Sequence, residues 1–260
     1  MEIERYENGV PSWVDLGAAD LSGAREFYGG LFGWNTPEGP AEAGGYSVCD
    51  IDGKTVAGLG PNMAPGAPPH WTTYVNVDSA DDTIAKVEAN GGRVFMPPMD
   101  VMEAGRMAIF ADPEGAAIGL WQPGEHPGAR LVNEPGTYCW SELMTDDLDG
   151  AKSFYRAVFG WESETQGSEG PAAAYTEWKV GGRSIGGMMA KPPTMPAGTP
   201  SFWGVYFAVA DTDATIVKAQ GLGASVLMGA TDIEPGRFAV LADRDGAMFS
   251  VLALKPELHG

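Results

Sequence analysis

The chain has 260 residues, 44% of them hydrophobic and 20% charged, a composition typical of a globular protein with one large or two modest domains. Sixteen basic against 35 acidic residues give a net charge of −19, a field that repels nucleic acid and anionic membranes and attracts cationic ligands. No apolar run approaches the ~20 residues that cross a bilayer, and the acidic N-terminus does not resemble a signal peptide. The distant cysteines Cys49 and Cys139 are expected as reduced thiols in a cytoplasmic protein.

The first predicted elements are a strand and a helix. Apolar residues alternate with other residues over 13–18, the period of a strand covered on one face. The next apolar residues have the spacing i, i+3, i+4, i+7 of one helix face: Ala24, Phe27, Tyr28 and Leu31. Asp20 or Ser22 can cap the start of this helix, and Gly33 can end it.

The following elements complete a pattern of one helix and several strands. Ile84 and Val87 indicate a second helix, which ends at the Asn-Gly-Gly sequence of residues 90–92. Strands are predicted around residues 94–96, 107–110 and 117–121, with a hairpin turn at 112–115. The order is βαβββ, twice in the first half of the chain and twice in the second.

The second half of the chain repeats the first. Residues 13–34 match residues 140–161 at 11 of 22 positions. Three further pairs of segments repeat in the same order: 46–54 with 175–183, 71–96 with 203–228, and 105–116 with 236–247. We therefore predict two domains, residues 1–121 and 137–260, joined by a linker rich in proline and glycine at 122–136.

These repeats carry a resemblance to a known family. The run D-L-x-x-A-x-x-F-Y-x-x-x-F-G-W begins at Asp20 and again at Asp147, and A-D-P-E-G precedes the last strand of the first unit. The chain thus resembles the vicinal oxygen chelate superfamily, which includes glyoxalase I, extradiol dioxygenases and bleomycin resistance proteins. The resemblance implies an α+β fold: four βαβββ modules form two glyoxalase-like domains whose curved sheets enclose clefts, built within each domain or by strand exchange.

The metal-ligand positions that the resemblance implies carry no suitable side chains. Metal-using members hold a divalent ion with His and Glu residues that project into the cleft. The corresponding positions hold Trp13, Thr72 and Gly119 in the first unit and Trp140, Gly204 and Ser250 in the second. His126 lies in the predicted linker and His259 beside the C-terminus, so neither is expected as a cleft ligand. The sequence predicts no metal and no cofactor in either cleft.

The cleft positions instead predict an aromatic surface around a carboxyl group. Trp13 and Trp140 offer indole faces to an aromatic or cationic ligand, or else pack as core. Strand alternation puts Asp15 and Glu142 on the same side, as candidate catalytic bases, as partners of a cationic ligand, or as structurally paired groups. The other candidate ligand-binding residues are Thr72, Tyr74, Trp121, Tyr206 and Ser250. Whether Arg106 and Arg237 face the clefts stays open, and a surface position is favoured.

Three functions fit this pattern. The first is metal-independent binding of a small aromatic or cationic molecule, such as an antibiotic or secondary metabolite, with unequal affinities in the two clefts. The second is a metal-free enzyme in which Asp15 or Glu142 abstracts a proton from an aromatic metabolite, as in an isomerase, lyase or hydroxylase-like step. The third is an interaction protein with vestigial clefts. The chain is expected as a two-domain monomer or a homodimer, without a nucleic-acid or membrane partner.

Overall fold

The computed structural model describes residues 1–63, 66–167, 174–193, 195–196 and 198–255. The first half contains β1 (Pro11–Ala18), α1 (Leu21–Phe32), the 3-10 turn η1 (Ala41–Ala43), β2 (Ser47–Ile51), β3 (Lys54–Pro61), β4 (His70–Asn76), α2 (Ala80–Ala89), β5 (Arg93–Val101), β6 (Gly105–Ala111) and β7 (Ala117–Pro123). The second half contains β8 (Tyr138–Thr145), α3 (Leu148–Phe159), β9 (Glu162–Gln166), β10 (Tyr175–Val180), β11 (Arg183–Ala190), β12 (Phe202–Ala208), α4 (Thr212–Gly221), β13 (Ser225–Ile233), β14 (Gly236–Ala242) and β15 (Met248–Leu254).

Each half of the chain forms one mixed sheet. The strand orders are β2-β3-β1-β4-β7-β6-β5 and β13-β14-β15-β12-β8-β11-β10-β9. The two modules of each half join through antiparallel pairs, β1 with β4 and β8 with β12. The predicted α+β fold of repeated modules is therefore confirmed, and each sheet is built within one half, without strand exchange.

The first module has one strand fewer than the other three. The segment after α1 makes only an isolated bridge, between Asn35 and Asp50, where the second half forms β9. Pro37 and Pro40 lie in this segment. Because proline has no N–H to donate, it interrupts the ladder of a sheet. This difference explains why the first sheet has seven strands and the second has eight.

The predicted helix signals are confirmed at α1 and α3. The residues of the predicted apolar stripe are all buried in α1, and α3 buries their counterparts: Ala151, Phe154, Tyr155 and Val158. Gly33 and Gly160 end the two helices with φ of 76° and 75°, the left-handed conformation that favours glycine. Asp147 caps α3 by accepting a bond from the Gly150 amide, whereas Asp20 stands at the same place without a side-chain cap bond. Among the described residues, no helix is long and apolar enough to span a bilayer.

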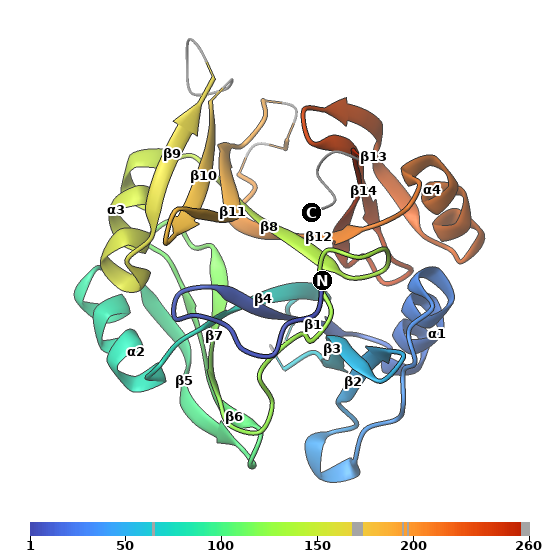
Figure 1. Ribbon diagram of the computed structural model, residues 1–260, viewed down its shortest axis with the longest axis horizontal. Coiled ribbons are helices and arrows are strands. Elements are labelled where there is room, and N and C mark those ends of the chain that lie inside the picture. Colours follow the sequence, from blue (N-terminus) through green and yellow to red (C-terminus); the bar gives the residue numbers. More distant parts are fainter. Residues whose placement is uncertain (64–65, 168–173, 194, 197, 256–260) are drawn as a thin grey trace.

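The two sheets lie back to back at the centre of the molecule, and their outer strands bend away from each other (Figure 1). Helices α1 and α4 lie together on one side, and α2 and α3 on the other (Figure 1). At the centre, the hydroxyls of Thr73 on β4 and Ser141 on β8 form a buried hydrogen bond of 2.6 Å. Both hydrophobic clusters of the core contain residues from both halves, so neither half buries its apolar surface alone.

A pair of buried polar contacts fastens the halves together. The Tyr28 hydroxyl on α1 donates to the Asp243 carboxylate at 3.0 Å, and it accepts a bond from the Trp71 indole at 3.0 Å. The reciprocal contact joins Tyr155 on α3 to Asp112 at 3.0 Å. Asp112 lies in the predicted hairpin turn of residues 112–115 and Asp243 at the same place in the second half, and each also accepts backbone amides. These turn residues therefore also hold the opposite half of the chain.

Candidate functional site

Four side chains of the first half form a hydrogen-bonded group around a carboxyl, which we call the first tetrad: Trp13, Asp15, Tyr46 and Tyr74. The Trp13 indole donates to the Tyr46 hydroxyl at 2.9 Å, and this hydroxyl donates to Asp15 at 3.1 Å. Tyr74, from the neighbouring strand β4, forms a second hydrogen bond with Asp15. The alternation of β1 puts Trp13 and Asp15 on the face opposite to Val14, which lies fully buried in the core.

The second half contains an equivalent group, the second tetrad: Trp140, Glu142, Tyr175 and Tyr206. The Trp140 indole donates to the Tyr175 hydroxyl at 2.8 Å, and the Tyr206 hydroxyl donates to Glu142 at 2.8 Å. Tyr175 also forms a side-chain hydrogen bond with Glu142. The same set of an indole, two phenols and a carboxyl thus occurs twice, with Asp in one copy and Glu in the other.

Glycines make the space that these tyrosines occupy. A Cβ atom on Gly58 would lie 1.9 Å from the Tyr46 hydroxyl, and one on Gly187 would lie 1.8 Å from the Tyr175 hydroxyl. A Cβ atom on Gly119 would lie 2.3 Å from the Tyr74 ring. Gly119 stands at a position where the resemblance implies a metal ligand in metal-using members. The ring of Tyr74 therefore fills the space that a ligand side chain at Gly119 would need.

Burial changes the acid–base properties of both tetrads. Loss of hydration raises the pKa of Asp15 to about 7, although its tyrosine hydrogen bonds act in the opposite direction. Burial also raises the pKa of Glu142. The pKa values of Tyr46 and Tyr206 lie well above their usual range, first because of burial and then because of the neighbouring carboxyl, so both remain hydrogen-bond donors. The first tetrad thus contains a carboxyl that can exchange a proton near neutral pH.

The structure brings together most of the predicted site residues. Trp13, Asp15 and Tyr74 meet in the first tetrad, while Trp140, Glu142 and Tyr206 meet in the second, where Ser250 also hydrogen-bonds Tyr206. Thr72 is the direct neighbour of Asp15 in the register of β1 and β4. Trp121 contacts the segment after β7, where its indole donates to the His126 backbone oxygen at 2.8 Å.

Sequence reasoning missed Tyr46 and Tyr175 as site residues. Both stand just before or at the start of a strand, outside the positions that the resemblance singled out. The signal was present in the internal repeat, because Tyr46 aligns with Tyr175 in a segment that otherwise shares little beyond a Gly followed by a basic residue. Both copies of the repeat keep this tyrosine and an acidic residue on the first strand. This shared pair would have suggested that the tyrosine contacts the carboxyl.

His126 lies in the predicted linker segment, but its ring packs against an indole of the first tetrad, a contact that the sequence did not predict. Its ring centroid lies 4.4 Å from that of Trp13, with the planes at 85°, and 5.6 Å from that of Trp121. The composition of residues 122–136 indicated an irregular segment, but it carried no information about where that segment folds. His259 lies outside the described residues.

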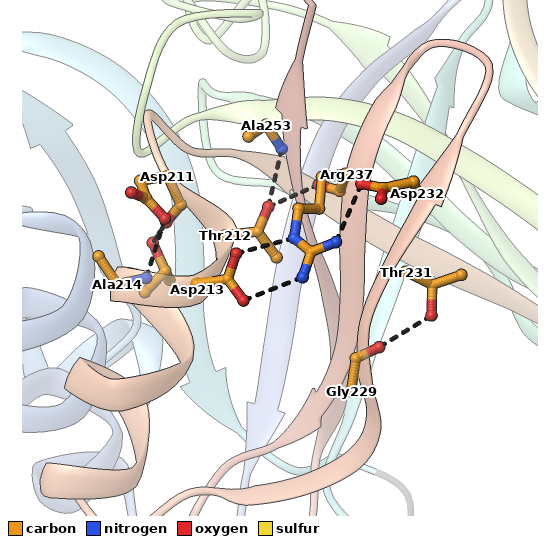
Figure 2. A network of polar contacts seen from close by, with 10 residues as sticks. Asp211, Thr212, Asp213, Ala214, Gly229, Thr231, Asp232, Arg237 and Ala253 are labelled. Carbon is orange, nitrogen blue, oxygen red and sulfur yellow. Dashed lines mark hydrogen bonds and ion pairs between the residues drawn. The ribbon is translucent and has the colours of Figure 1, made fainter.

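Arg106 and Arg237 do not belong to the tetrads. The Arg237 guanidinium donates two bonds to Asp213 on α4, at 2.7 and 3.1 Å, and one to Asp232 on β13, at 2.9 Å (Figure 2). Arg106 holds Asp81 and Asp100 in the same manner. Each arginine therefore ties the start of a helix to an edge strand at the surface, which agrees with the predicted surface position.

The side chains at the metal-ligand positions implied by the resemblance do not fit a divalent metal ion. Within the described ranges, no three His, Cys, Asp or Glu side chains gather closely enough to hold an ion. The predicted ligand positions present indole and hydroxyl groups or no side chain, none of which replaces imidazole or carboxylate as a ligand. We assign no metal-dependent step to this protein.

Comparison with known proteins establishes the family. The model of the Glyoxalase/Bleomycin resistance protein/Dioxygenase superfamily matches residues 11–120 and 140–251, and the chain belongs to this superfamily. It is 48% identical over 261 residues to "Putative glyoxylase CFP32" of Mycobacterium tuberculosis (strain CDC 1551 / Oshkosh), with 97% of both chains covered. It is 40% identical over 268 residues to "Anthracycline biosynthesis protein DnrV" of Streptomyces peucetius, with 97% of this chain and 96% of that one covered.

A solved structure shares the fold at much lower identity. The Mn(II)-bound glyoxalase from Novosphingobium aromaticivorans has a TM-score of 0.64 and 17% identity, covering 98% of this chain and 87% of that chain. At this level of identity the likeness supports the fold and no particular reaction.

Proposed function

We propose that the protein binds a planar aromatic molecule at its tetrads without a metal ion, and that the carboxyl of the tetrad pairs with a cationic group of this ligand. One observation carries the proposal: in both halves, an indole and two phenols surround a single carboxyl. Aromatic faces supply stacking surface, and the phenols orient polar groups of the ligand.

Two further observations support an aromatic, cationic ligand. The relative DnrV, 40% identical to this chain, is named for the biosynthesis of anthracyclines, which are planar polycyclic aromatic compounds. The net charge of −19 attracts cations toward the protein. An ammonium group beside Glu142 would oppose the effect of burial and return this carboxyl to its charged form.

Substitutions at the second tetrad test this proposal. We expect Trp140→Ala to weaken the binding of an amino-sugar anthracycline by about tenfold or more, because the stacking surface is lost. Glu142→Gln should weaken the binding of this compound but not that of its uncharged aglycone. Isothermal titration calorimetry measures both, and Glu162→Gln, which removes an exposed carboxylate on β9, is the matched control.

The outcomes of this titration are distinct. Equal losses for the aglycone and the amino-sugar compound in Glu142→Gln would show that the carboxyl does not recognise charge. Absence of saturable binding by either compound to the folded wild-type protein would overturn the proposed function.

A second candidate function is metal-free proton transfer on an aromatic metabolite. It is favoured by the position of Asp15, which accepts a hydrogen bond from Tyr46 at 3.1 Å in poorly hydrated surroundings; the loss of hydration raises the pKa of this carboxyl to about 7, which suits a general base at neutral pH. Tyr46 and Tyr74 would then hold the carboxyl in place. The variant that separates this function from simple binding is Asp15→Asn.

A further inference from the structure

The segment that follows β7 returns to the first tetrad and is fastened there at both ends. We call residues 124–129 the strap. At one end, the amides of Gly124 and His126 donate to the Ala104 oxygen at 2.8 and 3.0 Å. At the other end, the amide of Ala129 donates to the Ser12 oxygen at 2.8 Å. The backbone of the strap therefore fixes His126 beside β1.

The imidazole ring of His126 packs against two indole rings, in the way that the ring of a bound aromatic ligand would. It meets the rings of Trp13 and Trp121 edge to face, at centroid distances of 4.4 and 5.6 Å. This geometry is favourable for aromatic pairs. The imidazole Nε2 is buried and has no hydrogen-bond partner among the described residues. The ring thus lies in this space by packing, without a polar contact of Nε2 that holds it there.

The two tetrads differ in the access that they leave to their indoles. Trp13 is 3% exposed, whereas Trp140 is only half-buried. In the described part of the chain, no aromatic ring packs against Trp140 as His126 packs against Trp13. The His126 ring of the strap accounts for part of this difference, because it covers Trp13 while the indole of each tetrad makes the same bond to a tyrosine hydroxyl.

We infer that His126 is an internal ligand of the first tetrad, which occupies the ring-binding space against Trp13 and leaves the second tetrad as the site for an aromatic molecule from solution. The consequence for stoichiometry rests on the proposed function, whereas the occupation of the space by His126 does not. The protein then binds one aromatic ligand per chain, and proton transfer between Asp15 and a bound aromatic metabolite would require displacement of the strap. Displacement of the strap exposes a second site of the size of an imidazole ring or larger.

Removal of the imidazole tests the inference with imidazole itself as the probe. In His126→Gly, we expect added imidazole to raise the melting temperature and change the tryptophan fluorescence in a saturable manner. The control is His70→Gly: the His70 ring bonds the nearby Pro68 oxygen at 3.0 Å, and among the described residues it packs against no tryptophan ring. A response of His126→Gly equal to that of His70→Gly would overturn the inference.

Two further measurements keep the test decisive. If His126→Gly does not fold, proton NMR of the wild-type protein replaces it: the ring protons of His126 should be shifted by the tryptophan ring currents relative to those of His70, and unshifted protons contradict the inference. With an amino-sugar anthracycline, the number of sites should rise from one in the wild type to two in His126→Gly. If imidazole binds the variant but no anthracycline binds either protein, the proposed function fails and the internal ligand stands.

Discussion

Replacement of Tyr28 by phenylalanine is expected to lower the free energy of unfolding by about 2–4 kcal/mol. The hydroxyl of Tyr28 donates to Asp243 and accepts from Trp71, and all three side chains are buried. Phenylalanine fills nearly the same volume but leaves a buried carboxyl oxygen and a buried indole N–H without their partner. The loss of stability therefore comes from unpaired polar groups and not from a cavity.

The measurement is urea unfolding followed by circular dichroism, at a pH near 7. Tyr155→Phe should have a similar effect, because Tyr155 bonds Asp112 and Trp203 in the same arrangement. Tyr6→Phe is the matched control: its hydroxyl makes one hydrogen bond, to the Ala129 oxygen, and we expect a loss of only about 1 kcal/mol. If Tyr28→Phe is no more destabilising than Tyr6→Phe, the contact between the halves does not contribute as argued.

Asp15→Asn is expected to stabilise the protein above pH 7 and to have little effect near pH 4. The pKa of Asp15 is about 7 in the folded protein, against 3.8 for an unperturbed carboxyl. Between these values the folded state binds more protons than the unfolded state, so the contribution of Asp15 to stability falls as the pH rises. Asparagine keeps the size of the side chain and removes this charge.

The expected gain is on the order of 1–2 kcal/mol at pH 8. A difference of about three pKa units corresponds to ~4 kcal/mol at most. Asp15 is only half-buried, so solvent screening reduces this figure, and asparagine also weakens the bonds from Tyr46 and Tyr74. Unfolding free energies of the wild type and the variant at pH 4, 6 and 8 measure the effect, with Glu162→Gln as the exposed control. Equal pH profiles for the wild type and Asp15→Asn would contradict the raised pKa of Asp15.

The same variant separates the two candidate functions. A general base that is replaced by asparagine loses its proton acceptor, so turnover of a substrate should fall by at least about a hundredfold while affinity changes little. A site that only binds shows no turnover in either protein, and its affinity for a neutral aromatic compound stays the same.

The sequence alone determined the repeat, the module order and the places of the main helices. These features rest on local periodicity and on similarity between the two halves. The stripe of Ala24, Phe27, Tyr28 and Leu31 has one buried face in almost any compact fold, and Gly33 ends the helix through its own backbone freedom. The sequence also shows which residue types stand at the metal-ligand positions that the resemblance implies, and none of them is His, Asp or Glu.

Only the tertiary structure decided which distant residues meet. Three contacts join positions that are far apart along the chain. Tyr46 and Asp15 are separated by 31 residues, Tyr28 and Asp243 by 215, and His126 and Trp13 by over a hundred. No local pattern encodes such distances. These contacts follow from the back-to-back packing of the sheets, from the glycines that leave room for the tyrosine rings, and from the path of residues 122–136. The composition of that segment predicts an irregular, polar stretch but not its position in the fold.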